Sequence, residues 1–280
     1  MVALDATKKM ELKPVDFEKI RLLIYDKCGI NLHDGKKELV SARLGKRLRE
    51  GNFRSFAHYY DYVVTEDGAD ELIRMIDSIS TNLTYFFRED SHFQKLTAIL
   101  PNLLAAAATK GAPRLRIWSA ACSTGEEPYS VAIKVRESMN GTPIDVKVLA
   151  TDISTSVLKT AASGIYNAEK VKNVPTALVK KYFQGGTGKW EGHYRVKHDI
   201  RELVEFKRFN LMQPPPRGVC FDIIFCRNVM IYFDKQTQSA LVNRLYDSLA
   251  TGGYLFIGHS ESLTGLNHRL KYIEPSVYRK

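Results

Sequence analysis

The fold of this chain is decided by the stretch Leu115-Arg-Ile-Trp-Ser-Ala-Ala-Cys-Ser-Thr-Gly-Glu-Glu-Pro-Tyr-Ser130. It predicts a short apolar strand at 115–118, a turn of small residues, and a helix that begins at Thr124 or Gly125. Small residues at the end of a strand let a ligand approach the backbone, and the helix that follows offers free N–H groups. In an open α/β sheet, such a turn binds a nucleotide-like ligand beyond the carboxyl end of the first strand.

The residues of this turn indicate which kind of nucleotide-like ligand it can bind. The dinucleotide fingerprint G-x-G-x-x-G is incomplete, because only Gly125 is glycine, and two glutamates, Glu126 and Glu127, enter the helix. Their negative charge disfavours a pyrophosphate and favours a cationic adenosyl cofactor such as S-adenosylmethionine. Glu127 has two interpretations here: it completes a Thr124-x-x-Glu127 capping box, or it offsets the charge of the cofactor.

The composition argues against several classes of protein. The 280 residues are 44% hydrophobic, enough for one large or two ordinary domains, and no apolar run approaches the roughly 20 residues of a membrane helix. The charged N-terminus lacks the apolar region of a signal peptide, so export is not expected. The four cysteines form no C-x-x-C pair and no histidines stand at zinc spacing, which indicates reduced thiols in a cytoplasmic protein without a metal site.

The net charge of +10 lies entirely in residues 86–280, because residues 1–85 carry 14 basic and 14 acidic side chains. A basic surface suggests an acidic partner, and charge alone does not choose among nucleic acid, an anionic membrane and an acidic protein. Within the neutral part, residues 36–54 hold seven bases against two acids. The basic face of a helix expected at 37–49 is therefore either a solvated surface or a docking surface.

The hydrophobic pattern predicts an all-helical segment followed by an α/β domain. In the first segment, helices are expected up to Gly29 and at 37–49, 56–64 and 69–78. Beyond it, strands are expected at 115–118, 146–150, 203–206, 221–226 and 253–257, with helices at 126–138, 155–162 and 236–249. This alternation predicts a doubly wound, mainly parallel, Rossmann-like sheet. Residues 165–205 interrupt it and predict a small inserted antiparallel β-subdomain.

Polar side chains stand at two further strand ends. Asp152 follows the strand at 146–150, where a carboxylate can accept hydrogen bonds from both ribose hydroxyls or can support the start of the next helix. Asn228 follows the strand at 221–226, where it could hold a cofactor or the methyl-accepting group. Tyr232 could reach the same cleft or lie in the core. The junction at 81–93 is either an aromatic hinge or part of that cleft.

Five motifs together resemble those of the chemotaxis receptor methyltransferases, the CheR family. They are T-N-L-T-Y-F-F-R-E (81–89), W-S-A-A-C-S-T-G-E-E-P-Y-S (118–130), A-T-D-I-S (150–154), F-C-R-N-V-M-I-Y-F (225–233) and G-H-S-E-S (258–262). The resemblance runs in order from about residue 15 to the end. It implies an S-adenosylmethionine-dependent O-methyltransferase that forms γ-glutamyl methyl esters on bacterial chemoreceptors and releases S-adenosylhomocysteine.

The resemblance also implies a division of labour along the chain. A helical receptor-recognition domain would span 1–85, and a methyltransferase domain would span 86–280 with 165–205 inserted. Its cofactor contacts would be Asn82, Thr84, Arg88, Glu127, Asp152, Asn210, Leu211, Asn228 and Val229. These matches favour the functional interpretation of the junction, Glu127 and Asp152. Arg88 and Tyr232 match family positions near the transferred methyl group.

Two surfaces are expected to bind the receptor. The basic helix would face the Glu-rich receptor bundle through Lys36, Arg43, Lys46, Arg47 and Arg49. Some family members also bind a peptide from the receptor's C-terminus on the β-subdomain, and the stretch around Gly186, Gly188 and Arg195 resembles those members. An added strand at an exposed sheet edge would explain such a tether, and a glycine loop that only closes a hairpin is the alternative.

The chemistry needs neither a general base nor a metal. A glutamate carboxylate is ionised at neutral pH, since its reference pKa is about 4.3. Alignment of the carboxylate oxygen with the methyl carbon and sulfur then remains the main task. A nucleic-acid methyltransferase is one alternative, although residues 227–230 lack the prolines of an N/D-P-P-Y/F motif. A non-catalytic receptor-binding adaptor with the same fold is the other.

Overall fold

The computed structural model describes residues 10–109, 113–139, 141, 143–215 and 218–280. It divides the chain into two compact units, Met1–Thr81 and Asn82–Lys280. None of the helices within the described ranges is long and apolar enough to cross a membrane.

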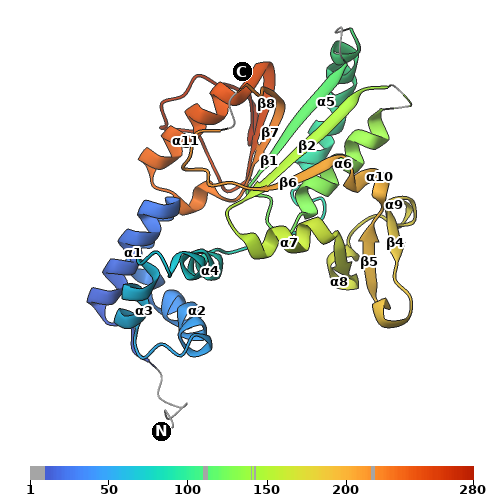
Figure 1. Cartoon of the computed structure of the whole chain (residues 1–280). Coiled ribbons are helices and arrows are strands. Elements are labelled where there is room, and N and C mark those ends of the chain that lie inside the picture. The colour runs from blue at the N-terminus through green and yellow to red at the C-terminus, as the bar shows by residue number, and fades with distance from the viewer. Residues whose placement is uncertain (1–9, 110–112, 140, 142, 216–217) are drawn as a thin grey trace. The chain divides into compact units, whose positions relative to one another are not determined.

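The first unit is all-helical, as its sequence pattern predicts (Figure 1). Its elements are α1 (Pro14–Cys28), the short 3-10 helix η1 (Asp34–Lys36), α2 (Lys37–Glu50), α3 (Phe56–Val63) and α4 (Ala69–Ile79). Gly29 ends α1 in a left-handed conformation with φ of 74°, and the Ser55 hydroxyl caps α3 by accepting from the N–H of His58. Val40, Leu44 and Leu48 are fully buried, which confirms the apolar stripe of α2.

The second unit is built on a seven-stranded sheet in the order β6-β2-β1-β7-β8-β10-β9. Strands β1 (Arg114–Ala120), β2 (Asp145–Asp152), β6 (Val204–Arg208), β7 (Phe221–Cys226) and β8 (Leu249–Ile257) are parallel. Helices α5 (Asp90–Ala108), α6 (Glu126–Ser138), α7 (Thr155–Ser163) and α11 (Lys235–Ser248) connect or precede them. The doubly wound, mainly parallel fold is therefore confirmed.

The strand order creates a switch point at β1. From β1 the chain adds β2 and β6 on one side and later adds β7 and β8 on the other. The carboxyl ends of β1, β2 and β7 consequently meet at one edge of the sheet (Figure 1), the place where such sheets bind ligands.

The sequence pattern missed the final hairpin. Strands β9 (Lys271–Glu274) and β10 (Val277–Arg279) pair antiparallel, and β10 also pairs antiparallel with β8. Three of the four β9 residues are exposed, so this edge strand lacks the alternation that signals a half-buried strand. The helix α5 has 19 residues and contains Pro101.

The inserted β-subdomain is present between α7 and β6. It contains β3 (Ile165–Asn167), α8 (Ala168–Val171), α9 (Thr176–Tyr182), β4 (Phe183–Gly185), the 3-10 helix η2 (Gly188–Trp190), β5 (His193–Val196) and α10 (His198–Arg201). Its sheet is antiparallel in the order β3-β5-β4, as expected for 165–205. The insertion is richer in helix than its sequence predicted.

Candidate active site

The turn after β1 adopts an unusual backbone that leaves little room for side chains. Ala121, Ser123 and Gly125 have φ of 64°, 49° and 94°. At Gly125 a Cβ would lie 2.8 Å from the Cβ of Ala161 and 2.9 Å from the hydroxyl of Tyr166. Only glycine satisfies both the conformation and the close approach at this position.

Asp152 is the last residue of β2 and is 7% exposed. Its Oδ2 accepts from the Ser123 N–H over 2.8 Å, and its Oδ1 accepts from the Ser154 N–H over 2.9 Å. The two carboxylate oxygens of Asp152 thus each accept from a backbone N–H, one in the turn after β1 and one at the start of α7. Asp152 therefore joins the turn after β1 to the start of α7, as the helix-start interpretation of this residue expects, and its ribose role stays a prediction.

Glu127 lies in the first turn of α6 but does not cap it. Its Oε1 accepts from the Ser119 hydroxyl over 2.7 Å, and its Oε2 pairs with Arg227 Nη1 over 2.9 Å. The helix begins after Gly125 without a side-chain cap, and the Thr124 hydroxyl donates to Glu126 instead. The capping-box interpretation is wrong, because both oxygens of Glu127 are bound to other elements of the sheet edge.

Arg227 organises this edge from the end of β7. Its side chain is 1% exposed, and its guanidinium donates to Glu127, to Glu89 Oε2 over 2.9 Å and to the carbonyl of Arg88 over 2.6 Å. Two carboxylates thus compensate a fully buried cation. The same contacts hold the segment that carries Arg88 against the first turn of α6.

Glu89 brings Arg88 and Asn228 together. Its Oε1 accepts from Asn228 Nδ2 over 3.2 Å and lies 4.0 Å from Arg88 Nε. Burial raises the pKa of the Glu89 carboxyl, but the charge of Arg227 and hydrogen bonds from Arg227 and Asn228 outweigh it, and the pKa stays below its usual value. The carboxylate is therefore ionised at neutral pH.

Asn228 sits in a loop that Glu261 fixes. The residue has φ of 58°, and its N–H donates to Glu261 Oε2 over 3.0 Å. Glu261 also accepts from the N–H groups of Gly258, Met230 and Ile231. Burial raises the pKa of Glu261, while these four backbone donors oppose the shift. Val229 follows as the residue that precedes the 3-10 helix η3 (Met230–Tyr232), which ends at the half-buried Tyr232.

The segment 82–88 lies against the turn after β1. The carbonyl of Asn82 accepts from the Ser123 hydroxyl over 3.2 Å, and the carbonyl of Thr84 accepts from Lys170 Nζ. Arg88 donates from Nη1 to the carbonyl of Leu83 over 2.7 Å, and its side chain is 24% exposed. A guanidinium has five N–H donors, so Arg88 can still bind a further acceptor.

Asn210 and Leu211 follow β6, two strands from β1. The Asn210 Oδ1 accepts from the Met212 N–H over 3.0 Å, and Leu211 is 8% exposed. Both residues lie beyond the carboxyl end of β6, on the same edge of the sheet as Asp152, which ends the neighbouring parallel strand β2.

Comparison with known proteins identifies the chain. Residues 82–279 match the family described as CheR methyltransferase, SAM binding domain, and residues 15–80 match CheR methyltransferase, all-alpha domain. The chain belongs to the CheR methyltransferase family. The resemblance, the methyltransferase class and the S-adenosylmethionine cofactor predicted from the sequence are therefore confirmed.

Curated relatives of this CheR chain are similar over almost their whole length. The chemotaxis protein methyltransferase of Borreliella burgdorferi is 42% identical, with 95% of this chain and 94% of the relative covered. That of Escherichia coli is 40% identical over 98% of this chain and 94% of the relative. Chemotaxis protein methyltransferase 2 of Pseudomonas aeruginosa is 41% identical over 94% and 92%.

The donor set of the CheR site fits a cationic adenosyl cofactor. The Glu127 carboxylate lies in the first turn of α6 and binds Ser119 of β1, and the Asp152 carboxylate ends β2 and binds the turn after β1. Negative charge suits a sulfonium and an ammonium group, and a carboxylate suits ribose hydroxyls.

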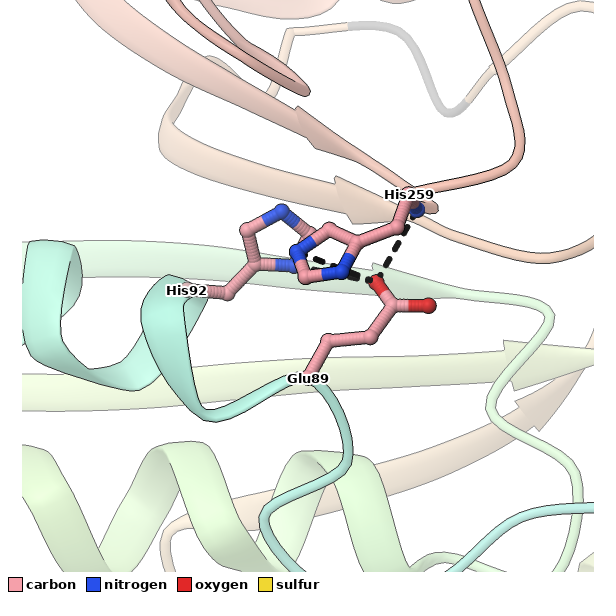
Figure 2. Close-up of side chains that lie close together, drawn as sticks. All are labelled: Glu89, His92 and His259. Carbon is pink, nitrogen blue, oxygen red and sulfur yellow. Dashed lines mark hydrogen bonds and ion pairs between the residues drawn. The ribbon is translucent and has the colours of Figure 1, made fainter.

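Glu89 also faces two histidines, as Figure 2 shows. Ligand atoms of Glu89, His92 and His259 lie within 4.8 Å of one another, and such residue types can bind a metal ion. However, the oxygen that faces both imidazoles lies 2.9 Å from the Arg227 guanidinium and accepts from the His259 N–H over 3.1 Å. The group is therefore better explained as a charge network than as a cation site.

His92 makes this network sensitive to acid. The side chain is 1% exposed, and burial together with the charge of Arg227 lowers the pKa of His92 from its usual 6.5 to about 3. Between these two pH values, His92 is therefore mostly protonated in the unfolded chain and mostly neutral in the folded chain.

We expect the free energy of unfolding to fall as the pH drops below about 6.5, by up to about 1.4 kcal/mol per pH unit from this group alone. Urea titrations at pH 7 and pH 5 measure the effect. His92→Phe, which keeps a ring against Phe256, should flatten the dependence. Equal slopes for the two proteins would contradict this role of His92.

Two of the five expected receptor-binding residues are partly buried against intramolecular partners, and a third, Lys46, makes an exposed ion pair with Glu50 over 3.8 Å. Arg43 donates to the carbonyls of Ile79 and Ser80 at the end of α4. Arg47 binds both oxygens of Glu71, over 2.9 and 2.6 Å. Lys36, Lys46 and Arg49 are exposed, and receptor binding by the five bases stays a prediction.

The expected tether residues Gly186, Gly188 and Arg195 occupy different parts of the β-subdomain. Arg195 is exposed but lies on β5, the central strand, so its backbone cannot accept an added strand. The free edges belong to β3 and β4. Gly186 is needed by the hairpin itself, because a Cβ there would lie 2.1 Å from the carbonyl oxygen of Trp190, whereas Gly188 lies in open space with φ of 59°.

Three residues of the network were not assigned a role from the sequence: Glu89, Arg227 and Glu261. Each lies inside one of the five motifs, at 81–89, 225–233 and 258–262. A charged residue directly after an apolar strand was the available signal for Arg227. The partners of that charge are distant in the sequence, so the pattern could not supply them.

Proposed function

We propose that this chain methylates glutamate side chains of bacterial chemoreceptors, in the cytoplasmic helical bundle of those receptors. The observation that carries the proposal is the pairing of Arg88 with Asn228 through Glu89 at the carboxyl edge of the sheet. A partly exposed guanidinium beside the cofactor residues can hold an anionic acceptor. The names of the curated relatives support a substrate in chemotaxis.

S-adenosylmethionine supplies an electrophilic methyl group when it is bound. Glu127 and Asp152 would hold the amino and ribose groups of this cofactor, with Asn82, Thr84, Asn210, Leu211, Asn228 and Val229 lining its site. Arg88 would orient the substrate carboxylate by charge-assisted hydrogen bonds. Tyr232, at the end of η3, would restrict the positions that this carboxylate can adopt. An ionised carboxylate carries no proton to remove, so no residue of this chain has to act as a base.

The test uses the full chain, tritiated methyl donor and receptor-containing membranes. Incorporated label should be released as methanol by mild alkali, because methyl esters hydrolyse and methylamines do not. Label in nucleic acid would instead support a nucleic-acid methyltransferase. Binding of S-adenosylhomocysteine without any transfer to receptors would support a non-catalytic adaptor.

The exposed bases of α2 are proposed to contact the acidic receptor. We expect Lys46→Glu with Arg49→Glu to lower receptor methylation several-fold at low salt and to reduce its salt dependence, because like charges then meet the receptor. S-adenosylhomocysteine affinity should not change. Lys13→Glu before α1 with Lys27→Glu in its last turn makes the same change of net charge and serves as the control. If both double variants methylate receptors at the same rate, the basic face of α2 is only a solvated surface and does not bind the receptor.

The β-subdomain is proposed to bind a receptor C-terminal peptide along the edge of β4. Gln184 of β4 and Arg195 of β5 are direct neighbours in the ladder and both are exposed, so Arg195 can reach past Gln184 to an acidic group. We expect calorimetry to detect such a peptide at micromolar concentrations and Arg195→Ala to weaken it about tenfold. Lys189→Ala is the control. If calorimetry detects no heat of binding with any receptor C-terminal peptide, the tether proposal is wrong.

A further inference from the structure

The inserted β-subdomain contacts the two segments that form the cofactor site. The ring of Phe86 lies edge-on to Tyr166 of β3 and to Phe183 of β4, with centroids 5.0 and 5.3 Å apart. The Tyr166 hydroxyl donates to the carbonyl of Thr124 over 2.8 Å, in the turn after β1. An apolar contact and a hydrogen bond thus join the insertion to both segments.

Lys170 of α8 makes the charged part of this connection. Its Nζ lies 2.8 Å from Glu126 Oε1 and donates to the carbonyl of Thr84 over 2.9 Å. The Asn167 side chain fixes the position of Lys170 by accepting its backbone N–H over 3.1 Å. One ammonium group therefore ties the loop at 82–88 to the first turn of α6.

Glu126 needs this partner. The residue is fully buried, and its other oxygen accepts only a neutral donor, the Thr124 hydroxyl, over 2.6 Å. A buried carboxylate that loses its cation pays a large desolvation cost and tends to move toward solvent. Such a movement would displace its neighbour Glu127, while the carbonyl of Thr84 would lose its donor.

We propose that the β-subdomain positions the cofactor site and that Lys170 is the positioning residue. The ammonium group sets the distance between the loop of Asn82, Thr84 and Arg88 and the turn that leads to Glu127. The inference rests on the proposed assignment of these residues to the cofactor. It gives the insertion a role in every catalytic cycle, whether or not a tether peptide is bound.

The experiment compares Lys170→Met with Lys172→Met in the full chain. Lys172 immediately follows α8 and pairs with the exposed Glu169 over 2.6 Å, so it is a matched surface control. We expect Lys170→Met to raise the Kd for S-adenosylhomocysteine about tenfold and the KM for the methyl donor by a similar factor, with a smaller change in kcat. Lys172→Met should match the unmodified chain.

Two further variants separate positioning from general stability. Lys170→Arg keeps the charge and should restore most of the affinity. Lys170→Met with Glu126→Gln removes both charges and should bind better than Lys170→Met alone, because no uncompensated carboxylate remains. A fall in melting temperature without a change in Kd at 20 °C would overturn the proposal, as would equal affinity of Lys170→Met and Lys172→Met. If Asp152 and Glu127 variants also bind normally, the cofactor assignment itself fails.

Discussion

Replacement of Arg227 by glutamine should lower methyl transfer by at least about 100-fold, since removing one partner of a buried ion pair typically costs about 3–5 kcal/mol. Arg227 is the common partner of Glu127, Glu89 and the Arg88 carbonyl. Without it, two carboxylates at the sheet edge repel one another, and the segment with Arg88 loses its anchor. Initial rates with receptor membranes and calorimetry with S-adenosylhomocysteine measure both consequences.

Two additional variants make this result interpretable. Arg227→Lys keeps the charge but cannot reach three acceptors with the geometry of a guanidinium, so we expect intermediate activity. Arg136→Gln on α6 removes a partly exposed arginine that donates to the carbonyl of Asp199, and it should leave the rate unchanged. If a folded Arg227→Gln protein works at the normal rate, the network does not organise the site.

Asp152→Asn should weaken S-adenosylhomocysteine binding by roughly 10- to 100-fold, because loss of a charged hydrogen-bond partner costs about 1.5–3 kcal/mol. Asparagine retains one oxygen for the backbone N–H groups that Asp152 now binds, so it disturbs the turn less than alanine would. Calorimetry on the folded variant gives the change in Kd.

A modified ligand separates the ribose role of Asp152 from its role in the turn. An S-adenosylhomocysteine analogue without the 2′- and 3′-hydroxyls should bind the unmodified chain weakly and should bind Asp152→Asn almost equally well. If the substitution weakens both ligands by the same factor, Asp152 acts only through the turn, and the ribose assignment is wrong.

The sequence by itself determined the order of helices and strands and the edge at which the site forms. Apolar strands such as 115–118 and 221–226 have a local pattern, and parallel strands bring their carboxyl ends to one edge. Asp152 and Asn228 could therefore be placed near each other without coordinates. The β9–β10 hairpin could not, because an exposed edge strand carries little periodic signal.

Only the tertiary structure decided which charged side chains are partners. Whether Glu127 caps its helix was decided by Ser119 and by Arg227, 100 residues later, which bind its two oxygens. The sequence pattern places Arg43 and Arg47 on the exposed basic face of α2. In the structure, Arg43 binds the carbonyl of Ile79 at the end of α4, and Arg47 binds Glu71 of α4. Long side chains reach partners that no local spacing specifies, because the distance between two groups depends on how separate elements pack. Local sequence patterns therefore determined the helices, strands and site edge of this methyltransferase, and tertiary packing determined its ion pairs.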